Sequence, residues 1–223
     1  MTAETSRSGR QRLAPEVRRQ QVLDAAVAVF SSEGFHGASM DAVAARAGVS
    51  KPLVYVHGGS KEELFAACLH READRLLRSV QSAAGEPDGD PLARLRRALR
   101  AFFHALTTRR EGWTVLWRQA STGPFAGEVD ALRRRIVEQA ADLMAGGLRV
   151  PRARVLPYTH TLVGAAEGLA DWWLTDPDAA ATTGPGDPAD VLADLLVAVV
   201  GPGLAALTDS ASIAPSAPVS GER

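Results

Sequence analysis

The sequence predicts an all-α protein in which a small N-terminal head precedes a larger helical body. Apolar residues recur at three- and four-residue steps through most of the 223 residues, and the alternation that is typical of strands does not appear. Residues that start and stop helices, chiefly serine, aspartate, glycine and proline, stand between these apolar segments. Together these observations predict about nine helices.

Four parts are expected along the chain. Residues 1–14 form a flexible basic arm, 15–60 the head, 61–207 the body, and 208–223 a disordered tail of small residues, serine and proline. The arginines of the arm, Arg7, Arg10 and Arg12, could follow DNA phosphates. A merely solvated arm is an equally good interpretation.

Composition restricts the class of protein without naming its partner. The formal net charge of −1 does not single out nucleic acid, and hydrophobic residues make up 46% of the chain, enough for a buried core. The single cysteine, Cys68, excludes an intrachain disulfide. Because there is neither a signal peptide nor an uncharged apolar run long enough to span a bilayer, we expect a soluble, cytoplasmic protein.

The head is expected to contain three helices, of which the first covers residues 18–35. Ser39 can cap the second, and Gly48 can end it in the left-handed conformation. Ser50 is expected to cap the third, and Pro52 falls in its first turn, where a missing N–H breaks no helical bond. This arrangement of two short helices and a tight turn is typical of proteins that read the DNA major groove.

The third helix is expected to enter the groove. Its exposed face would carry Lys51, Leu53 and His57, with Tyr55 toward the edge, a set that can bind phosphates and base edges. Two glycines at 58 and 59 end it. Ser60 and the glutamate three residues on then form a capping box that opens the long helix into the body.

This region resembles the DNA-binding domain of the tetracycline-repressor (TetR) family of bacterial regulators. The resemblance covers a quarter to a third of the chain, and many members have a phenylalanine where this chain has Gly58. It rests on these residues: Arg18, Val22, Leu23, Ala25, Ala26, Phe30, Gly34, Phe35, Ser39, Val43, Ala44, Ala47, Gly48, Val49, Ser50, Tyr55, His57, Lys61, Glu62 and Leu64.

The resemblance implies a DNA-binding surface. It implies backbone contacts for Lys51, Tyr55, His57 and Lys61, and base contacts for residues 50–53. The full predicted set is Ser39, Ser50, Lys51, Pro52, Leu53, Tyr55, His57 and Lys61. Other interpretations stay open, since Tyr55 and His57 could pack between helices, Lys61 could simply be solvated and Ser50 could serve only as a cap.

The body is expected to hold the remaining helices. One starts at Asp90-Pro91, with its arginines at 94, 96, 97 and 100 on the solvent side. A short helix follows around Trp113 and Trp117, and another covers 127–144, where the arginines at 133–135 form a solvated arc. Pro157 either starts the next helix late or kinks it, and the last helix begins after Pro188.

Bulky rings with a few polar tips in the body have the composition of a small-molecule pocket. Plain core packing is the competing interpretation for each of these residues. Arg118 could pair with an acidic ligand or lie on the surface. The predicted pocket residues are Phe103, His104, Trp113, Trp117, Met144, Tyr158 and Thr161.

Small residues at helical spacing beside two tryptophans, together with the apolar helix 191–200, predict a homodimer interface, and packing within the chain is the alternative. The predicted interface residues are Gly164, Gly168, Trp172, Leu192, Leu196 and Val199. The resemblance implies a four-helix bundle made by two helices from each subunit. A dimer also suits DNA binding, because a single recognition helix reads only a few base pairs.

An enzyme is disfavoured because zinc-ligand spacings, a phosphate-binding loop and a nucleophile elbow are all missing, and the sequence indicates no cofactor. We therefore expect a dimeric repressor that binds an inverted-repeat operator of double-stranded DNA and is released by a small-molecule inducer. The alternative is a DNA-binding regulator that is controlled by a protein partner or without a small molecule.

Overall fold

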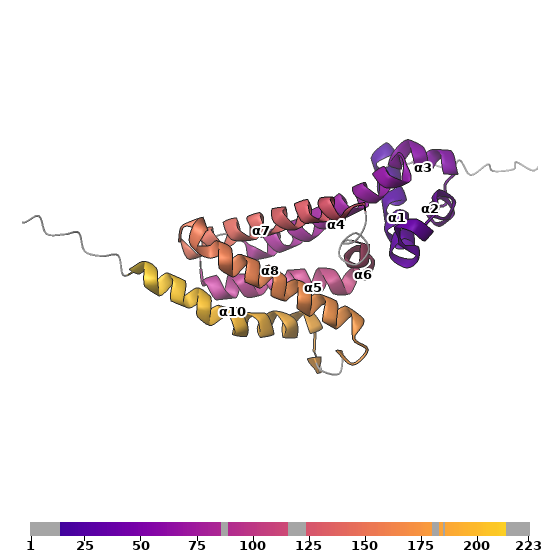
Figure 1. The fold of residues 1–223 in the computed structure, drawn as a ribbon. Helices are drawn as coiled ribbons and strands as arrows, with labels where there is room; N and C mark the ends of the chain where they lie inside the picture. The colour runs from indigo at the N-terminus through magenta and orange to yellow at the C-terminus, as the bar shows by residue number, and fades with distance from the viewer. Residues whose placement is uncertain (1–13, 86–88, 116–123, 180–182, 185, 213–223) are drawn as a thin grey trace, which may run out of the picture. The chain divides into compact units, whose positions relative to one another are not determined.

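The computed structural model describes residues 14–85, 89–115, 124–179, 183–184 and 186–212, and it describes no side chains beyond Leu207. Every regular element within these ranges is a helix, as the sequence predicts (Figure 1). The chain divides into two compact units, one ending at Leu69 and the other starting at His70. We call the first the head and the second the body.

Three complete helices and the start of a fourth make up the head. Their bounds are α1 Pro15–Gly37, α2 Met40–Ala47, α3 Lys51–Gly58 and α4 Lys61–Ala84. The rings of Phe30 and Phe65 meet edge to face, with centroids 4.9 Å apart, and both side chains are almost fully buried. Gln21 Nε2 donates to the carbonyl of Ala47 at 2.6 Å, which ties α1 to the end of α2.

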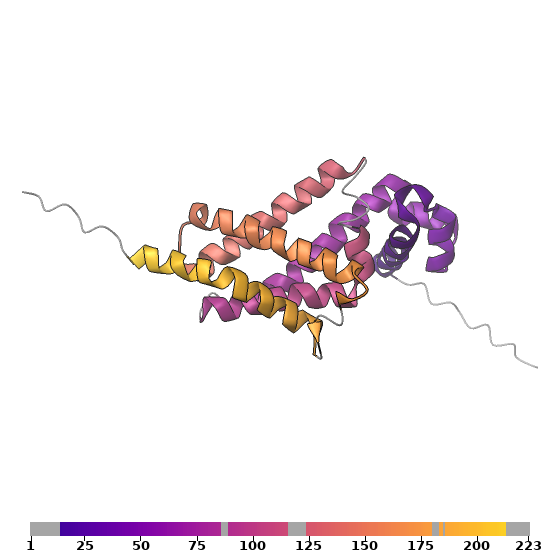
Figure 2. The same cartoon turned by 60° about the horizontal axis from the view of Figure 1, so that its bottom comes forward.

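The body is formed by the rest of α4 and by five further described helices. These are α5 Pro91–Thr108, α6 Arg110–Trp113, α7 Ala126–Leu148, α8 Arg152–Thr175 and α10 Pro188–Ser212. In Figures 1 and 2, α8 lies between α7 and α10, and α5 packs along α10. Their shared core contains Leu99, Phe103, Trp113, Leu162, Ala166, Trp173, Leu192 and Leu196.

Charged pairs join α5 to α10 along the outer edge of the body. Arg96 forms a bidentate pair with Asp194, and Arg100 Nε lies 2.7 Å from Asp190 Oδ1. The hydrogen bond from Arg96 lowers the pKa of Asp194. These ion pairs hold the first part of α10 against α5.

Several expected helix limits shift in the structure. Helix α7 continues to Leu148, about one turn beyond Met144, and α10 extends to Ser212, beyond the point where the apolar period stops at Thr208. Pro157 lies inside α8, which begins at Arg152. Because Pro157 falls near the start of α8, its missing N–H removes one helical bond while leaving the rest of the helix intact.

Helix α10 is the most apolar of the described helices. Its stretch Pro188–Leu207 has a mean hydropathy of 1.9 and passes a length-and-composition test for a membrane span. One such helix is weak evidence for a membrane protein, because a core helix passes the same test. In this fold Leu192, Leu196 and Leu204 are buried against other helices of the body, which accounts for the apolar sequence.

Candidate nucleic-acid interface and ligand cavity

Helix α2 is fixed at both ends by the residues that the sequence indicated. At its start the hydroxyl of Ser39 accepts a hydrogen bond from the Ala42 N–H at 3.1 Å. At its end Gly48 has φ 64° and ψ 33°, and its N–H donates to the carbonyls of Ala44 and Ala45. A side chain at Gly48 would be strained by this left-handed conformation, so glycine sets the turn that leads into α3.

Ser50 precedes α3 but does not cap it with its side chain, contrary to the expectation. The donors that a cap would use are missing or occupied. Pro52 has no N–H, and the Leu53 N–H donates to the Ser50 backbone carbonyl at 3.0 Å. The hydroxyl of Ser50 therefore makes no capping bond, and the residue is exposed.

Helix α3 is held to the head by one fully buried side chain, that of Val54. At 100° per residue, positions two before and two after Val54 point almost directly away from the core. These positions are Pro52 and Val56, and Val56 has 75% of its surface exposed. Val56 therefore offers an apolar contact at the centre of the exposed side of α3.

Two pairs of residues flank Pro52 and Val56. Lys51 and Tyr55 are exposed on one edge, and Leu53 and His57 are half-buried on the other. We refer to Lys51, Pro52, Leu53, Tyr55, Val56 and His57 together as the outward face of α3. It combines an apolar centre, able to contact a thymine methyl, with edges able to donate to phosphates.

Lys51 is oriented by an ion pair, since its Nζ lies 2.8 Å from Asp41 Oδ2 on α2. The hydrogen bond and the charge of Asp41 raise the pKa of Lys51, which keeps the ammonium charged. Both side chains are well exposed. Because exposed ion pairs contribute little free energy, Lys51 can exchange Asp41 for a phosphate at small cost.

Lys61 already has partners within the head. Its Nζ donates to the carbonyl of His36 at 3.2 Å and lies 4.9 Å from the centroid of the Phe35 ring. These contacts connect the start of α4 to the end of α1. A DNA contact by Lys61 remains a prediction. It would use the ammonium N–H groups that do not donate to His36.

The capping box at the start of α4 is present. The Glu63 N–H donates to the Ser60 hydroxyl at 3.1 Å, and the Ser60 N–H donates to Glu63 Oε2 at 2.7 Å. This backbone hydrogen bond lowers the pKa of Glu63. Gly58 stands close to Leu64, whose Cδ1 would be 2.7 Å from a Cβ at position 58. Leu64 thus fills the space beside Gly58.

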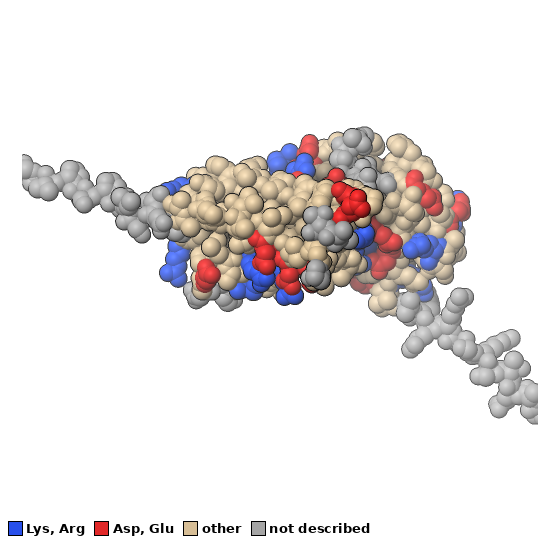
Figure 3. Space-filling model, turned by 90° about the horizontal axis from the view of Figure 1, so that it is seen from below, with Lys and Arg blue, Asp and Glu red and all other residues tan. Residues whose placement is uncertain are grey.

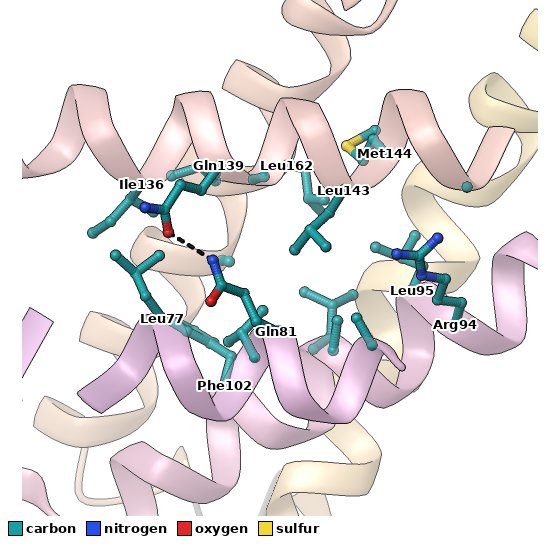
Figure 4. A pocket seen from close by; sticks show the side chains of 18 of the residues that line it. Leu77, Gln81, Arg94, Leu95, Phe102, Ile136, Gln139, Leu143, Met144 and Leu162 are labelled. Carbon is teal, nitrogen blue, oxygen red and sulfur yellow. Dashed lines mark hydrogen bonds between the residues drawn. The ribbon is translucent and has the colours of Figure 1, made fainter. Parts of the chain in front are cut away.

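The body contains an apolar cavity of about 140 Å³ (Figure 4). Helices α4, α5, α7, α8 and α10 all contribute to its walls. Its lining includes Leu76, Leu77, Val80, Leu95, Leu99, Phe102, Ile136, Leu143, Met144, Leu162 and Leu204. A concave site of this composition, with few polar groups, is typical of small-molecule binding.

Four polar side chains border this cavity. Gln81 Nε2 donates to Gln139 Oε1 at 2.9 Å, so these two amides satisfy one another (Figure 4). Glu167 accepts a hydrogen bond from Arg133 at 2.5 Å. The fourth is Arg94, which was expected on the solvent side of α5 and is instead 91% buried, since only 9% of its surface is exposed.

Part of the outer surface formed by α8 and α10 is uncharged. Figure 3 shows a broad uncharged surface over these two helices, beside the charged pairs of α5 and α10. Apart from the adjacent residues and the backbone of α8 itself, no described atom lies within 4 Å of a Cβ built on Gly164 or Gly168. On α10, Leu195 and Val199 are 49% and 67% exposed.

Comparisons with known proteins agree with this geometry. The family described as bacterial regulatory proteins, tetR family, matches residues 22–68, and the one described as tetracyclin repressor-like, C-terminal domain, matches residues 91–200. The transcriptional activator FasR of Mycolicibacterium smegmatis is 35% identical over 169 residues, covering 74% of this chain and 76% of FasR. The chain belongs to the TetR family of transcriptional regulators.

Two further relatives illustrate the range of this TetR-family similarity. A transcriptional repressor of Streptomyces coelicolor is 41% identical over 66 residues, which cover 30% of this chain and 34% of that protein. The crystal structure of a TetR-like regulator from Rhodococcus sp. RHA1 is 42% identical with a TM-score of 0.69, covering 87% of this chain and 99% of that chain. The TetR fold thus covers both the head and the body.

The predicted pocket residues of this TetR-family body lie in several places. Met144 lines the apolar cavity, and its Sδ accepts a hydrogen bond from Thr159 at 3.3 Å. His104 and Trp113 line a second, more polar hollow of about 310 Å³ beside Glu72. Trp117 and Arg118 lie outside the described residues.

The other predicted pocket residues are placed in the core or on the surface. Phe103 is fully buried in the core. Tyr158 lies against Gly203, where a Cβ would be 3.3 Å from its ring. Thr161 is exposed, and its hydroxyl donates to the carbonyl of Pro157 at 3.0 Å.

The predicted dimer residues divide in a similar way. Gly164, Gly168 and Val199 are exposed on the uncharged surface of α8 and α10. Leu192 and Leu196 are buried in the core of their own chain. Trp172 is half-buried, and its Nε1 donates to Asp176 Oδ2 at 2.9 Å.

Sequence reasoning missed Val56 in the TetR-family head and Arg94 in the body. A helical wheel centred on the buried Val54 would have placed Val56 outward. For Arg94 the signal was Ala98 and Phe102, four and eight residues on, which line the same cavity as Arg94. Among the described residues, no group of three or more His, Cys, Asp or Glu side chains could hold a metal ion.

Proposed function

We propose that this TetR-family protein is a homodimeric, ligand-responsive repressor. It binds an inverted-repeat operator in double-stranded DNA and is released by a small-molecule inducer. The observation that carries the proposal is the outward face of α3, where exposed Val56 and Pro52 are bordered by Lys51 and Tyr55. Since it binds chromosomal DNA, the protein would act in the bacterial cytoplasm.

The DNA contacts follow from this face. Lys51 and Tyr55 would bind phosphates and fix the register of α3, while Pro52 and Val56 would contact base edges in the major groove. The hydroxyl of Ser50, which makes no capping bond, is available as a further donor. His57, near the end of α3, and Lys61, at the start of α4, would contact the DNA backbone on either side of the turn between these helices.

Pairing of two heads is required for a specific site. Helix α3 has eight residues and is therefore about 12 Å long, so it covers only a few base pairs. In a two-fold dimer the recognition helices would enter successive major grooves about 34 Å apart. The uncharged surface of α8 and α10, with exposed Leu195 and Val199, is the surface that would pair with a second copy.

The cavity provides the means of control. Helix α4 begins in the head at Lys61, and its residues Leu76, Leu77 and Gln81 line the cavity in the body. A ligand that moves this wall would move the start of α4 and change the spacing of the two heads. To weaken operator binding a hundredfold, it must favour the released state by about 2.8 kcal/mol, a modest coupling energy.

A second candidate function keeps the DNA contact and changes its outcome. FasR, which is 35% identical, is named a transcriptional activator. The same outward face of α3 would then recruit the protein to a promoter that it activates. The remaining alternative is a regulator that a protein partner controls. It would bind DNA through the same face of α3, and its cavity would bind no regulatory ligand.

Selection of bound sequences from random DNA, followed by footprinting, tests the proposal. We expect an inverted repeat, protected symmetrically on both strands, and release of that DNA by some member of a small-molecule collection. Absence of any enriched sequence would contradict DNA binding. Retention of DNA under every compound, together with release by a protein fraction, would favour the partner-controlled regulator.

A further inference from the structure

Arg94 is an unusual residue in the wall of the apolar cavity. It lies in the first turn of α5 with 9% of its surface exposed. Figure 4 shows it among the lining side chains, next to Leu95 and across from α7. Its neighbours Arg96 and Arg97 on the same helix are both exposed. The buried charge is therefore specific to Arg94.

The guanidinium of Arg94 lacks partners for part of its donor set. Its Nε and Nη1 are buried and have no hydrogen-bond partner among the residues that the structure describes. Arg96 and Arg133, by contrast, each have a carboxylate. A buried charge with unused donors is costly, and natural proteins keep such groups paired or reserve them for a ligand.

No carboxylate of the cavity wall is available to Arg94. Glu167 is the only acidic residue in the described lining, and it is paired with Arg133. Arg133 and Gly147 are fourteen positions apart on α7, which corresponds to about 21 Å. Because the Arg94 guanidinium meets α7 at Gly147, Glu167 belongs to the opposite end of the cavity.

Glycine at position 147 lets the Arg94 guanidinium approach α7 in the wall of the cavity. A Cβ on Gly147 would lie only 2.9 Å from Arg94 Nη1, so glycine keeps this approach open. Away from this end, the lining follows α5 from Arg94 to Phe102, a distance of about 12 Å. The side chains along that path are almost all apolar, and the amides of Gln81 and Gln139 bond to one another.

We propose that the cavity binds an amphipathic anion, with its anionic oxygen-bearing head on Arg94 and its apolar tail along α5 and α7. The head is a carboxylate or a phosphate monoester, both of which match the planar donor fork of arginine. The tail is an extended hydrocarbon. Only the regulatory role of this anion rests on the proposed function, and binding of the anion can be tested by itself.

Direct binding of four probes with the same tail and different heads tests the proposal. The probes are dodecanoate, dodecyl phosphate, dodecanol and dodecyltrimethylammonium, titrated below their micelle concentrations against the full-length protein. We expect at least one anion to bind about tenfold or more tightly than dodecanol, and the cation to bind most weakly. The stronger of the two anions identifies the head group.

Three variants assign the preference to Arg94. Arg94→Met should reduce anion affinity about tenfold or more and leave dodecanol affinity nearly unchanged, whereas Arg94→Lys should keep part of the preference. Arg134→Met, which removes an exposed arginine from α7, is the matched control and should change nothing. The ratio of anion to alcohol affinity is the deciding readout, because loss of folding would lower both affinities together.

Two outcomes would overturn the inference. One is equal binding of anions and dodecanol to the wild-type protein, and the other is an anion preference that survives Arg94→Met. Absence of any probe binding would overturn it as well. Operator binding is measured on the same samples. An anion that binds through Arg94 without releasing DNA would support this site and contradict the proposed repressor that an inducer releases. The two proposals can therefore fail separately.

Discussion

The head and the body differ in what fixes their structure. In the head, local hydrogen bonds at Ser39, Gly48 and Ser60 determine where helices start and stop, and the rings of Phe30 and Phe65 pack in its core. In the body, long helices meet through side chains far apart in sequence and leave a cavity that contains the buried Arg94.

This difference matches the two proposed roles, DNA reading by the head and ligand binding by the body. A DNA-reading surface must present its side chains in one geometry, which short capped helices on a closed core provide. A ligand site needs space and unused polar groups, and these reduce stability. On this account the head is the rigid unit of the protein and the body is the adaptable one.

The largest effect is expected when the head core is opened. Phe65→Ala removes a fully buried ring that contacts Phe30 and Phe35, and it should lower the free energy of unfolding by about 3–5 kcal/mol. Leu143→Ala, in the wall of the existing cavity, should cost less than half as much. Denaturant unfolding measures both, and an equal loss would show that the body is packed as tightly as the head.

The next effect concerns DNA affinity. The double substitution Lys51→Ala with Tyr55→Ala should weaken operator binding about a hundredfold, because two phosphate contacts are lost from one edge of α3. Fluorescence anisotropy of labelled operator gives the affinity, and sedimentation checks that the dimer persists. Arg134→Ala in the body serves as the control. Unchanged affinity in the double variant would remove these residues from the interface.

A third variant tests the uncharged surface of the body. Val199→Asp places a charge on a residue that is 67% exposed, so the single chain should fold normally. If this surface pairs with a second copy, the buried charge should halve the mass in solution and weaken operator binding about tenfold or more. Ala131→Asp, at an exposed position of α7, should leave the mass unchanged. A dimer that tolerates Val199→Asp would place the interface elsewhere.

The smallest effect is a pH dependence at the joint between α3 and α4. The Ser60 N–H lowers the pKa of Glu63 below its ordinary value of 4.5, so this bond stabilises the folded head above that pH and is lost as the pH falls through the lowered pKa. Glu63→Gln should therefore flatten the decline of the melting temperature on acidification. Glu62→Gln, which removes a charge from the same turn, should leave the decline as it is in the wild type.

The sequence was most informative where structure depends on neighbouring residues. The cap at Ser39, the left-handed Gly48 and the capping box at Ser60 could all be predicted, because each uses residues within four positions. Ser50 was assigned a cap that Pro52 prevents, since the helical position of a proline decides which donors exist. The family follows from the same local spacings.

The body was less predictable because burial there depends on tertiary packing. Arg94 looks like its exposed neighbours in sequence, and only the approach of α7 at Gly147 makes it a cavity residue. The aromatic residues Phe103 and Trp113 suggested a pocket, yet Phe103 packs in the core and Trp113 lies beside the second hollow. Composition alone does not tell which rings face a cavity.

The central claim is that the outward face of α3 reads bases while the body sets the spacing of two such faces. Repeating the selection from random DNA with Val56→Gln tests it most directly, because Val56 is 75% exposed and its replacement should leave the fold intact. We expect the preferred base to change at the same position in both halves of the inverted repeat, with the half-site spacing unchanged. An identical selected sequence, or a changed spacing, would contradict the account.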